Sequence, residues 1–245
     1  MFIHYRWRTR INWSWTSFWR NESDIGNNGG TSFTLGCEFE DANKETNISN
    51  YKYYEFEADN FCSGHSSLAD QYTSPLRYLT KIVGDIYEHS YGFVLSDVAT
   101  SGTSVPNAIP TGASIIFGVD DTEDRTSEFK EILEEKLEEI KEEFPNETNV
   151  TCSVKKLSTN PTNVLNNDSS ARVINLLNEL SCGVISPKTD INYYATSNIA
   201  PVEIDWQPKT GNPTFSLSIY PRSFSVDILK LMKTNIEAKY IECLE

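Results

Sequence analysis

Residues 51–65 read YKYYEFEADNFCSGH, and this stretch decides how the rest of the chain is arranged. Its first half is rich in aromatic side chains, which is typical of a β-strand. The strand ends among small residues around His65, and a helix-like run follows from Pro75, a residue that suits the first helical turn. A histidine at such a corner is held up by the backbone, where it can act on a group outside its own domain. His65 is therefore the first candidate functional residue.

The elements around this strand predict an α+β fold. Residues 51–156 follow the order strand, helix, strand, strand, helix, strand, and the clearest helix runs from Arg125 to Phe144 with one apolar stripe. This order is typical of the ferredoxin-like split βαβ plan, an antiparallel sheet with helices packed on one face. We expect the second half of the chain to enlarge this domain with extra helices and with strands at 191–198, 201–206 and 213–220.

Composition excludes several classes of function. Apolar content of 38% and aromatic content of 12% are typical of a folded protein with a real core. The net charge of −14 argues against a nucleic-acid partner, which requires a basic face. No apolar run approaches the roughly 20 residues of a membrane span, so we expect no membrane partner. The five cysteines are widely spaced and the N-terminal residues form no apolar signal segment, so we expect a reducing, cytoplasmic setting.

Residues 1–30 differ in composition from the remainder. Four of the five Trp and four of the eight Arg lie in the first 20 residues. Such an arm fits a membrane surface or single-stranded nucleic acid, but Arg and Trp follow no helical or alternating period. We therefore interpret residues 1–30 as an atypical segment that is either disordered or read in a shifted frame, and residues 31–245 as the folded domain.

Most catalytic constellations are missing from the sequence. A hydrolytic zinc site needs three or more converging His, Asp, Glu or Cys ligands. The three histidines, His4, His65 and His89, are far apart, and no second His follows any of them at i+2 or i+4. The chain has neither a Gly-x-Ser-x-Gly elbow nor a phosphate-binding glycine loop. The residues alone indicate a scaffold that displays one histidine.

Three short motifs, in the same order, resemble the lid domain of the Xaa-His dipeptidases, the aminoacyl-histidine dipeptidase and carnosinase-like branch of the zinc metallopeptidases. Ser63-Gly64-His65-Ser66 is similar to the family's Gly-Gly-His-Ser-Gly. Asn107-Ala108-Ile109-Pro110 is similar to its Asn-Ala-Ile-Pro hairpin, and Tyr220-Pro221-Arg222-Ser223 to its Ile-Arg-Ser. Leu35-Gly36-Cys37 also resembles the Met-Gly-Cys that precedes the lid.

The resemblance implies roles for three residues. His65 would stabilise the oxyanion of the tetrahedral intermediate, Asn107 would hydrogen-bond the substrate, and Arg222 would pair with the free carboxylate of a dipeptide. Without the resemblance, the same residues read as a surface His, a turn-forming Asn and an Arg bound to backbone carbonyls. The family's lid is ferredoxin-like and helps to dimerise, and its zinc ligands and catalytic Glu belong to a separate catalytic domain.

The chain departs from the family where chemistry is concerned, because the zinc ligands and the catalytic Glu have no counterpart. The family's Asp-Glu-Glu should fall near residues 5–15, where YRWRTRINWSW stands instead. We interpret residues 31–245 as the lid domain of a zinc-dependent dipeptidase, without a cofactor or metal ligand of its own and not catalytic alone, so whether the chain is an enzyme stays open. Its expected partners are a dipeptide and either a second copy, as a homodimer, or an intact relative. The alternative is a non-catalytic dimerisation or regulatory module.

Overall fold

The computed structural model describes residues 8–14, 29–30, 32–40, 43–120, 123–180, 182–186, 194–207 and 212–244. Of the atypical segment 1–30 it describes only β1 (Arg8–Ser14), which pairs with β3, and β2 (Gly29–Gly30), which pairs with β10. The rest of that segment lies outside the described residues, so its interpretation stays a prediction. Within the described part, no helix is both long enough and apolar enough to cross a membrane.

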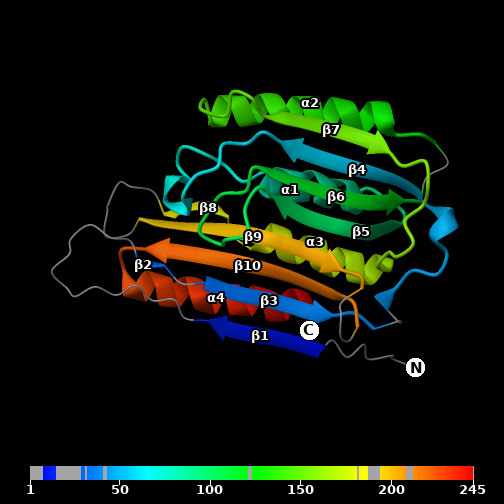
Figure 1. The fold of residues 1–245 in the computed structure, drawn as a ribbon. Coiled ribbons are helices and arrows are strands. Elements are labelled where there is room, and N and C mark those ends of the chain that lie inside the picture. The colour runs from blue at the N-terminus through cyan, green and yellow to red at the C-terminus, as the bar shows by residue number, and fades with distance from the viewer. Residues whose placement is uncertain are drawn as a thin grey trace.

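A four-stranded antiparallel sheet contains the strand formed by the first half of residues 51–65. It consists of β4 (Lys52–Asp59), β5 (Phe93–Ser101), β6 (Gly112–Val119) and β7 (Thr151–Lys156), in the spatial order β5-β6-β4-β7 (Figure 1). Helix α1 (Pro75–Glu88) connects β4 to β5, and α2 (Thr126–Glu143) connects β6 to β7. The predicted α+β class and the predicted order of these six elements are confirmed.

A second antiparallel sheet follows the order β1-β3-β10-β9-β8. Its remaining strands are β3 (Ser32–Glu38), β8 (Gly183–Ser186), β9 (Ala195–Asp205) and β10 (Thr214–Ser223). The helices of this half are α3 (Asn167–Glu179) and α4 (Val226–Leu244). Short 3-10 turns lie at Ile48–Asn50 and Ser66–Leu68.

The two sheets lie side by side, with β9 next to β5 (Figure 1). Val202 N–H donates to Thr100 Oγ1 at 3.1 Å, and Trp206 Nε1 donates to the carbonyl of Ser96 at 2.8 Å. One buried cluster of apolar side chains extends across both sheets. Elements from both halves of the chain are therefore packed into one core.

Aromatic side chains dominate the core beneath the first sheet. Phe129 of α2 meets Tyr54 edge-on, with ring centroids 4.9 Å apart, and Phe56 at 5.4 Å. Phe56 also meets Phe117 edge-on at 4.9 Å. Edge-to-face pairs of this kind are stabilising beyond the area that they bury. These contacts fix α2 against β4 and β6.

The sequence prediction of two separate strands at 191–198 and 201–206 is wrong within the described residues. A single strand, β9, continues through Pro201. Proline has no N–H to donate, and the β9–β10 ladder shifts its register opposite this position, between Leu217 and Ile219. Strand β8 was not predicted, because its four residues are too few to show an alternating pattern.

Candidate functional site

His65 lies in the loop between β4 and α1, where backbone hydrogen bonds join it to the hairpin loop between β5 and β6. Ile109 N–H donates to Gly64 O, and Ser66 N–H donates to Asn107 O, each at 2.8 Å. His65 itself forms an isolated β-bridge with Ala108. The motifs at residues 63–66 and 107–110 are therefore in direct contact through their main chains.

Arg222, at the end of β10, belongs to the motif at residues 220–223, and its side chain contacts His65. Its Nη1 lies 2.8 Å from His65 Nδ1 and 2.5 Å from His65 Nε2, although the two residues are 157 positions apart. Asn107 joins the site through its carbonyl, which accepts from Ser66 N–H, and its side chain is half-buried. The structure thus brings the His65 and Arg222 side chains together and holds Asn107 beside them.

The contacts of His65 define its protonation state. Its Nδ1 accepts from Ser67 N–H at 3.3 Å and lies 2.9 Å from Ser67 Oγ. Partial burial of the ring, and then the positive charge of Arg222, lower the pKa of His65 below its usual value. We therefore assign a neutral imidazole at pH 7, and because guanidinium N–H groups only donate, a ring nitrogen of His65 accepts from Arg222 Nη1.

Arg222 is held as a buried cation. Its residue surface is only 9% exposed, and burial lowers its pKa, while neighbouring Tyr220 acts in the opposite direction. The guanidinium Cζ lies 5.8 Å from the centroid of the Tyr220 ring, within the range of a cation–π contact. Gly30, opposite Arg222 in the ladder, leaves room for this ring, because a Cβ there would collide with the Tyr220 hydroxyl. Arginine remains protonated even so, since its intrinsic pKa is far above neutral.

Asn198 and Tyr194, which the sequence did not suggest as site residues, hold the two loops that meet at His65. Asn198 is 2% exposed and donates both amide hydrogens, to Pro106 O at 2.9 Å and to Ala108 O at 2.8 Å. Tyr194 donates its hydroxyl to Ser67 O at 3.0 Å, and burial raises the pKa of that hydroxyl to about 12. The only local signal was an asparagine inside a strand-like run, where this residue is disfavoured.

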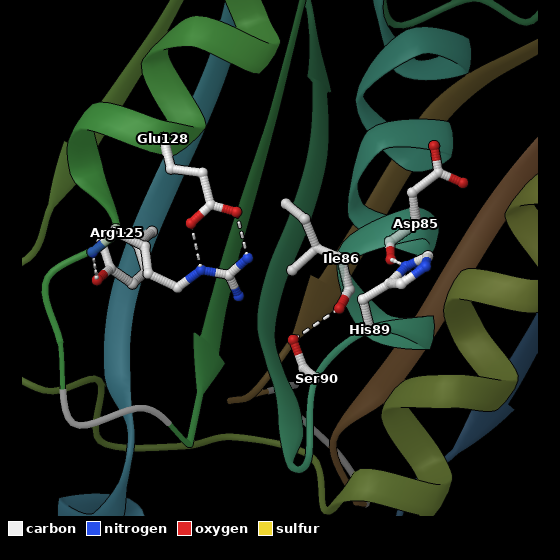
Figure 2. A network of polar contacts seen from close by, with 7 residues as sticks. Asp85, Ile86, His89, Ser90, Arg125 and Glu128 are labelled. Atoms are coloured by element: carbon white, nitrogen blue, oxygen red, sulfur yellow. Dashed lines mark hydrogen bonds and ion pairs between the residues drawn. The ribbon is translucent and has the colours of Figure 1, made fainter.

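His89 shows the contrasting case of a histidine in a structural position. Its Nδ1 lies 2.7 Å from the carbonyl of Asp85 at the end of α1, and Ser90 Oγ donates to Ile86 O at 2.6 Å (Figure 2). Arg125 in the same view pairs with the carboxylate of Glu128, through Nε at 2.8 Å and Nη2 at 2.5 Å. His89 thus completes a helix end, whereas His65 faces the cation Arg222.

The residues around His65 do not fit a zinc site. Across the part of the chain that the structure describes, no three His, Cys, Asp or Glu side chains gather closely enough to hold a metal ion. The immediate neighbour of both His65 ring nitrogens is a guanidinium, which repels a divalent cation. The fixed positive charge of Arg222 makes the site better suited to an anion than to a metal cation.

Comparison with known proteins places this fold. No family model matches the chain, and no curated protein matches its sequence. The structure is similar to aminoacylhistidine dipeptidase from Vibrio alginolyticus, with a TM-score of 0.71 and 14% identity over 88% of this chain and 42% of the dipeptidase.

Two further solved structures match less than half of the chain. A putative aminohydrolase from methicillin-resistant Staphylococcus aureus is 13% identical over 46% of this chain and 31% of its own, and a putative amidohydrolase/peptidase from Burkholderia cenocepacia is 12% identical over 45% and 28%. Both have TM-scores of 0.25, too low to indicate a shared fold. The resemblance noted in the sequence is thus confirmed at the level of the fold: the chain has the fold of part of an aminoacylhistidine dipeptidase and spans 42% of that protein's length.

Proposed function

We propose that this chain is the lid domain of a dipeptidase-like peptidase and that it recognises the carboxylate end of a peptide. The observation that carries the proposal is the contact between His65 and Arg222, which come from different sheets and distant parts of the sequence. The Arg222 guanidinium is a donor only, and in this structure it donates to the neutral imidazole of His65. A carboxylate oxygen is a stronger acceptor for a guanidinium than a neutral group is, so an entering carboxylate would compete with His65 for this donor.

The charges at the site favour an anion over a cation or a neutral group. Arg222 is buried, so its charge is poorly screened by water, and an entering carboxylate would offset the cost of that burial. The guanidinium fork suits the two oxygens of a carboxylate better than an ammonium group would. His65, exposed at the surface, is then free to donate to a second oxygen of the ligand, such as a developing oxyanion.

The proposal assigns recognition, and not hydrolysis, to this chain. Peptide hydrolysis needs an activated water, and the described residues provide no metal site for it. A role in recognising substrate for a catalytic centre in a neighbouring or partner domain would explain why the described residues around His65 and Arg222 form no metal site. We place this role in the cytoplasm and expect the site to act on a catalytic centre held elsewhere.

Ligand titration tests the proposal directly. The chain is titrated with glycyl-histidine and with its C-terminal amide, while NMR follows the His65 ring and the Arg222 side chain. We expect the amide to bind roughly 10- to 100-fold more weakly, because a hydrogen bond to a charged group contributes about 1.5–3 kcal/mol. Arg222→Lys should weaken dipeptide binding, and Arg172→Lys on α3, where the arginine pairs with Asp168 at 3.2 Å, should not. Equal affinity for the acid and the amide would refute the proposal. A dimeric chain that binds neither ligand would support the dimerisation module instead.

A further inference from the structure

One buried carboxylate accepts hydrogen bonds from both ends of the loop that carries His65. Glu147, in the turn after α2, is only 1% exposed. Its Oε2 accepts from Cys62 N–H at 2.8 Å, and its Oε1 accepts from Thr73 N–H at 3.2 Å. Cys62 and Thr73 stand at the two ends of the loop between β4 and α1, with His65 between them.

We infer that Glu147 is a positioning residue for His65, holding the two ends of the 62–73 loop at a fixed separation. The inference rests on the proposed function only for its consequence in binding, since the geometry of the loop is independent of any ligand. Other hydrogen bonds hold the middle of the loop, where Ser66 N–H donates to Asn107 O and Tyr194 Oη donates to Ser67 O, and its first end, where Phe61 N–H donates to Thr111 O at 3.1 Å. Glu147 differs from those hydrogen bonds because its one side chain binds both ends of the loop and so links them to each other.

The chemistry of this position requires a carboxylate. An ionised carboxylate is purely an acceptor, and its two oxygens match two backbone N–H donors that would otherwise be buried without partners. A glutamine of the same shape offers one oxygen and one NH₂, so one backbone N–H would face a second donor. An aspartate keeps both oxygens but is one methylene shorter. The backbone also fixes where the side chain starts, because Glu147 N–H donates to Phe144 O at 2.9 Å at the end of α2.

The consequence concerns the relation between His65 and Arg222. Arg222 is fixed by β10, while His65 is placed by its loop. A shift of about 1 Å in a positioned group can remove most of its effect on a bound substrate. Loosening the loop ends should therefore separate the imidazole from the guanidinium without unfolding either sheet.

The experiment measures the loop in the absence of ligand, using Glu147→Gln, Glu147→Asp and the control Glu142→Gln. Glu142 lies on the exposed surface at the end of α2, so its variant removes the same charge nearby without touching the loop. Amide hydrogen exchange follows the Cys62 and Thr73 N–H groups, and NMR titration follows the His65 ring. Circular dichroism melting verifies that each variant is folded.

In Glu147→Gln we expect exchange of the Cys62 or Thr73 amide to become about tenfold faster or more, because a hydrogen bond to a charged acceptor is lost. The pKa of His65 should rise toward the value of an exposed histidine, since the ring moves away from Arg222. Glu147→Asp should shift both readouts in the same direction, and Glu142→Gln should leave both unchanged.

Two results would overturn the inference. One is a folded Glu147→Gln variant with unchanged exchange at both amides and an unchanged His65 pKa. The other concerns the unaltered protein and does not depend on any variant folding: free exchange at either Cys62 or Thr73 would mean that the carboxylate does not hold the loop. Neither result involves a dipeptide, so failure of the inference is distinguishable from failure of the proposed function. If the inference about Glu147 and the proposed function are both correct, Glu147→Gln should weaken glycyl-histidine binding and Glu142→Gln should not change it.

Discussion

Replacing Asn198 with alanine should release the 106–108 turn from β9 and destabilise the whole domain. The buried amide of Asn198 donates two hydrogen bonds, at 2.9 and 2.8 Å, to the carbonyls of Pro106 and Ala108. Each such bond contributes about 1 kcal/mol, so the free energy of unfolding should fall by about 2 kcal/mol. For a domain of this size, the melting temperature should fall by roughly 4–8 °C.

Thermal unfolding followed by circular dichroism measures this change, with Asn175→Ala as the matched control. Asn175 is an exposed asparagine on α3, where the substitution should change the unfolding free energy by less than about 0.5 kcal/mol. Asn198→Asp should be more destabilising than Asn198→Ala at neutral pH, because a carboxylate would face two carbonyl oxygens in a buried position. A melting temperature of Asn198→Ala equal to that of the control would refute the reasoning.

Three other outcomes are expected. The lowered pKa of His65 means that the native state binds fewer protons than the unfolded chain, so the unfolding free energy should decrease as pH falls through about 6.5; denaturant titrations at several pH values should show that His65→Gln removes part of this decrease. Phe129→Ala should cost about 3–5 kcal/mol in urea unfolding, because the ring is fully buried; the half-buried Leu137→Ala on the same helix should cost less, and equal losses would contradict the packing described. Atomic absorption should find substoichiometric zinc on the purified chain, and about two tightly bound ions per chain, as in dinuclear sites, would contradict the absence of fit at His65.

Local patterns in the sequence predicted the order of elements well. The apolar stripe expected between Arg125 and Phe144 corresponds to α2 at Thr126–Glu143, because helix periodicity depends on neighbouring residues alone. The aromatic-rich run Tyr51–Ala58 likewise predicted β4. These features are encoded within short windows, and tertiary packing did not override them.

The site was less accessible to the same reasoning. His65 and Arg222 were paired with a function only through the family resemblance, since 157 residues separate them and no local pattern signals their contact. Asn198 and Glu147 were missed because their partners are backbone groups of distant loops, which carry no side-chain signature. Such contacts depend on how the two sheets are joined, and strand pairing at long range is not written in any short window.

Because the two sheets meet at β5 and β9, the His65–Arg222 pair depends on the assembly of both sheets. His65 is attached to the four-stranded sheet and Arg222 to the six-stranded sheet, so the pair closes only when both sheets have formed and come into register. Contacts of such large sequence separation carry a high loop-closure cost and are expected late in folding. An anion bound at the two side chains would then link the two sheets. It would stabilise only molecules in which both sheets have formed.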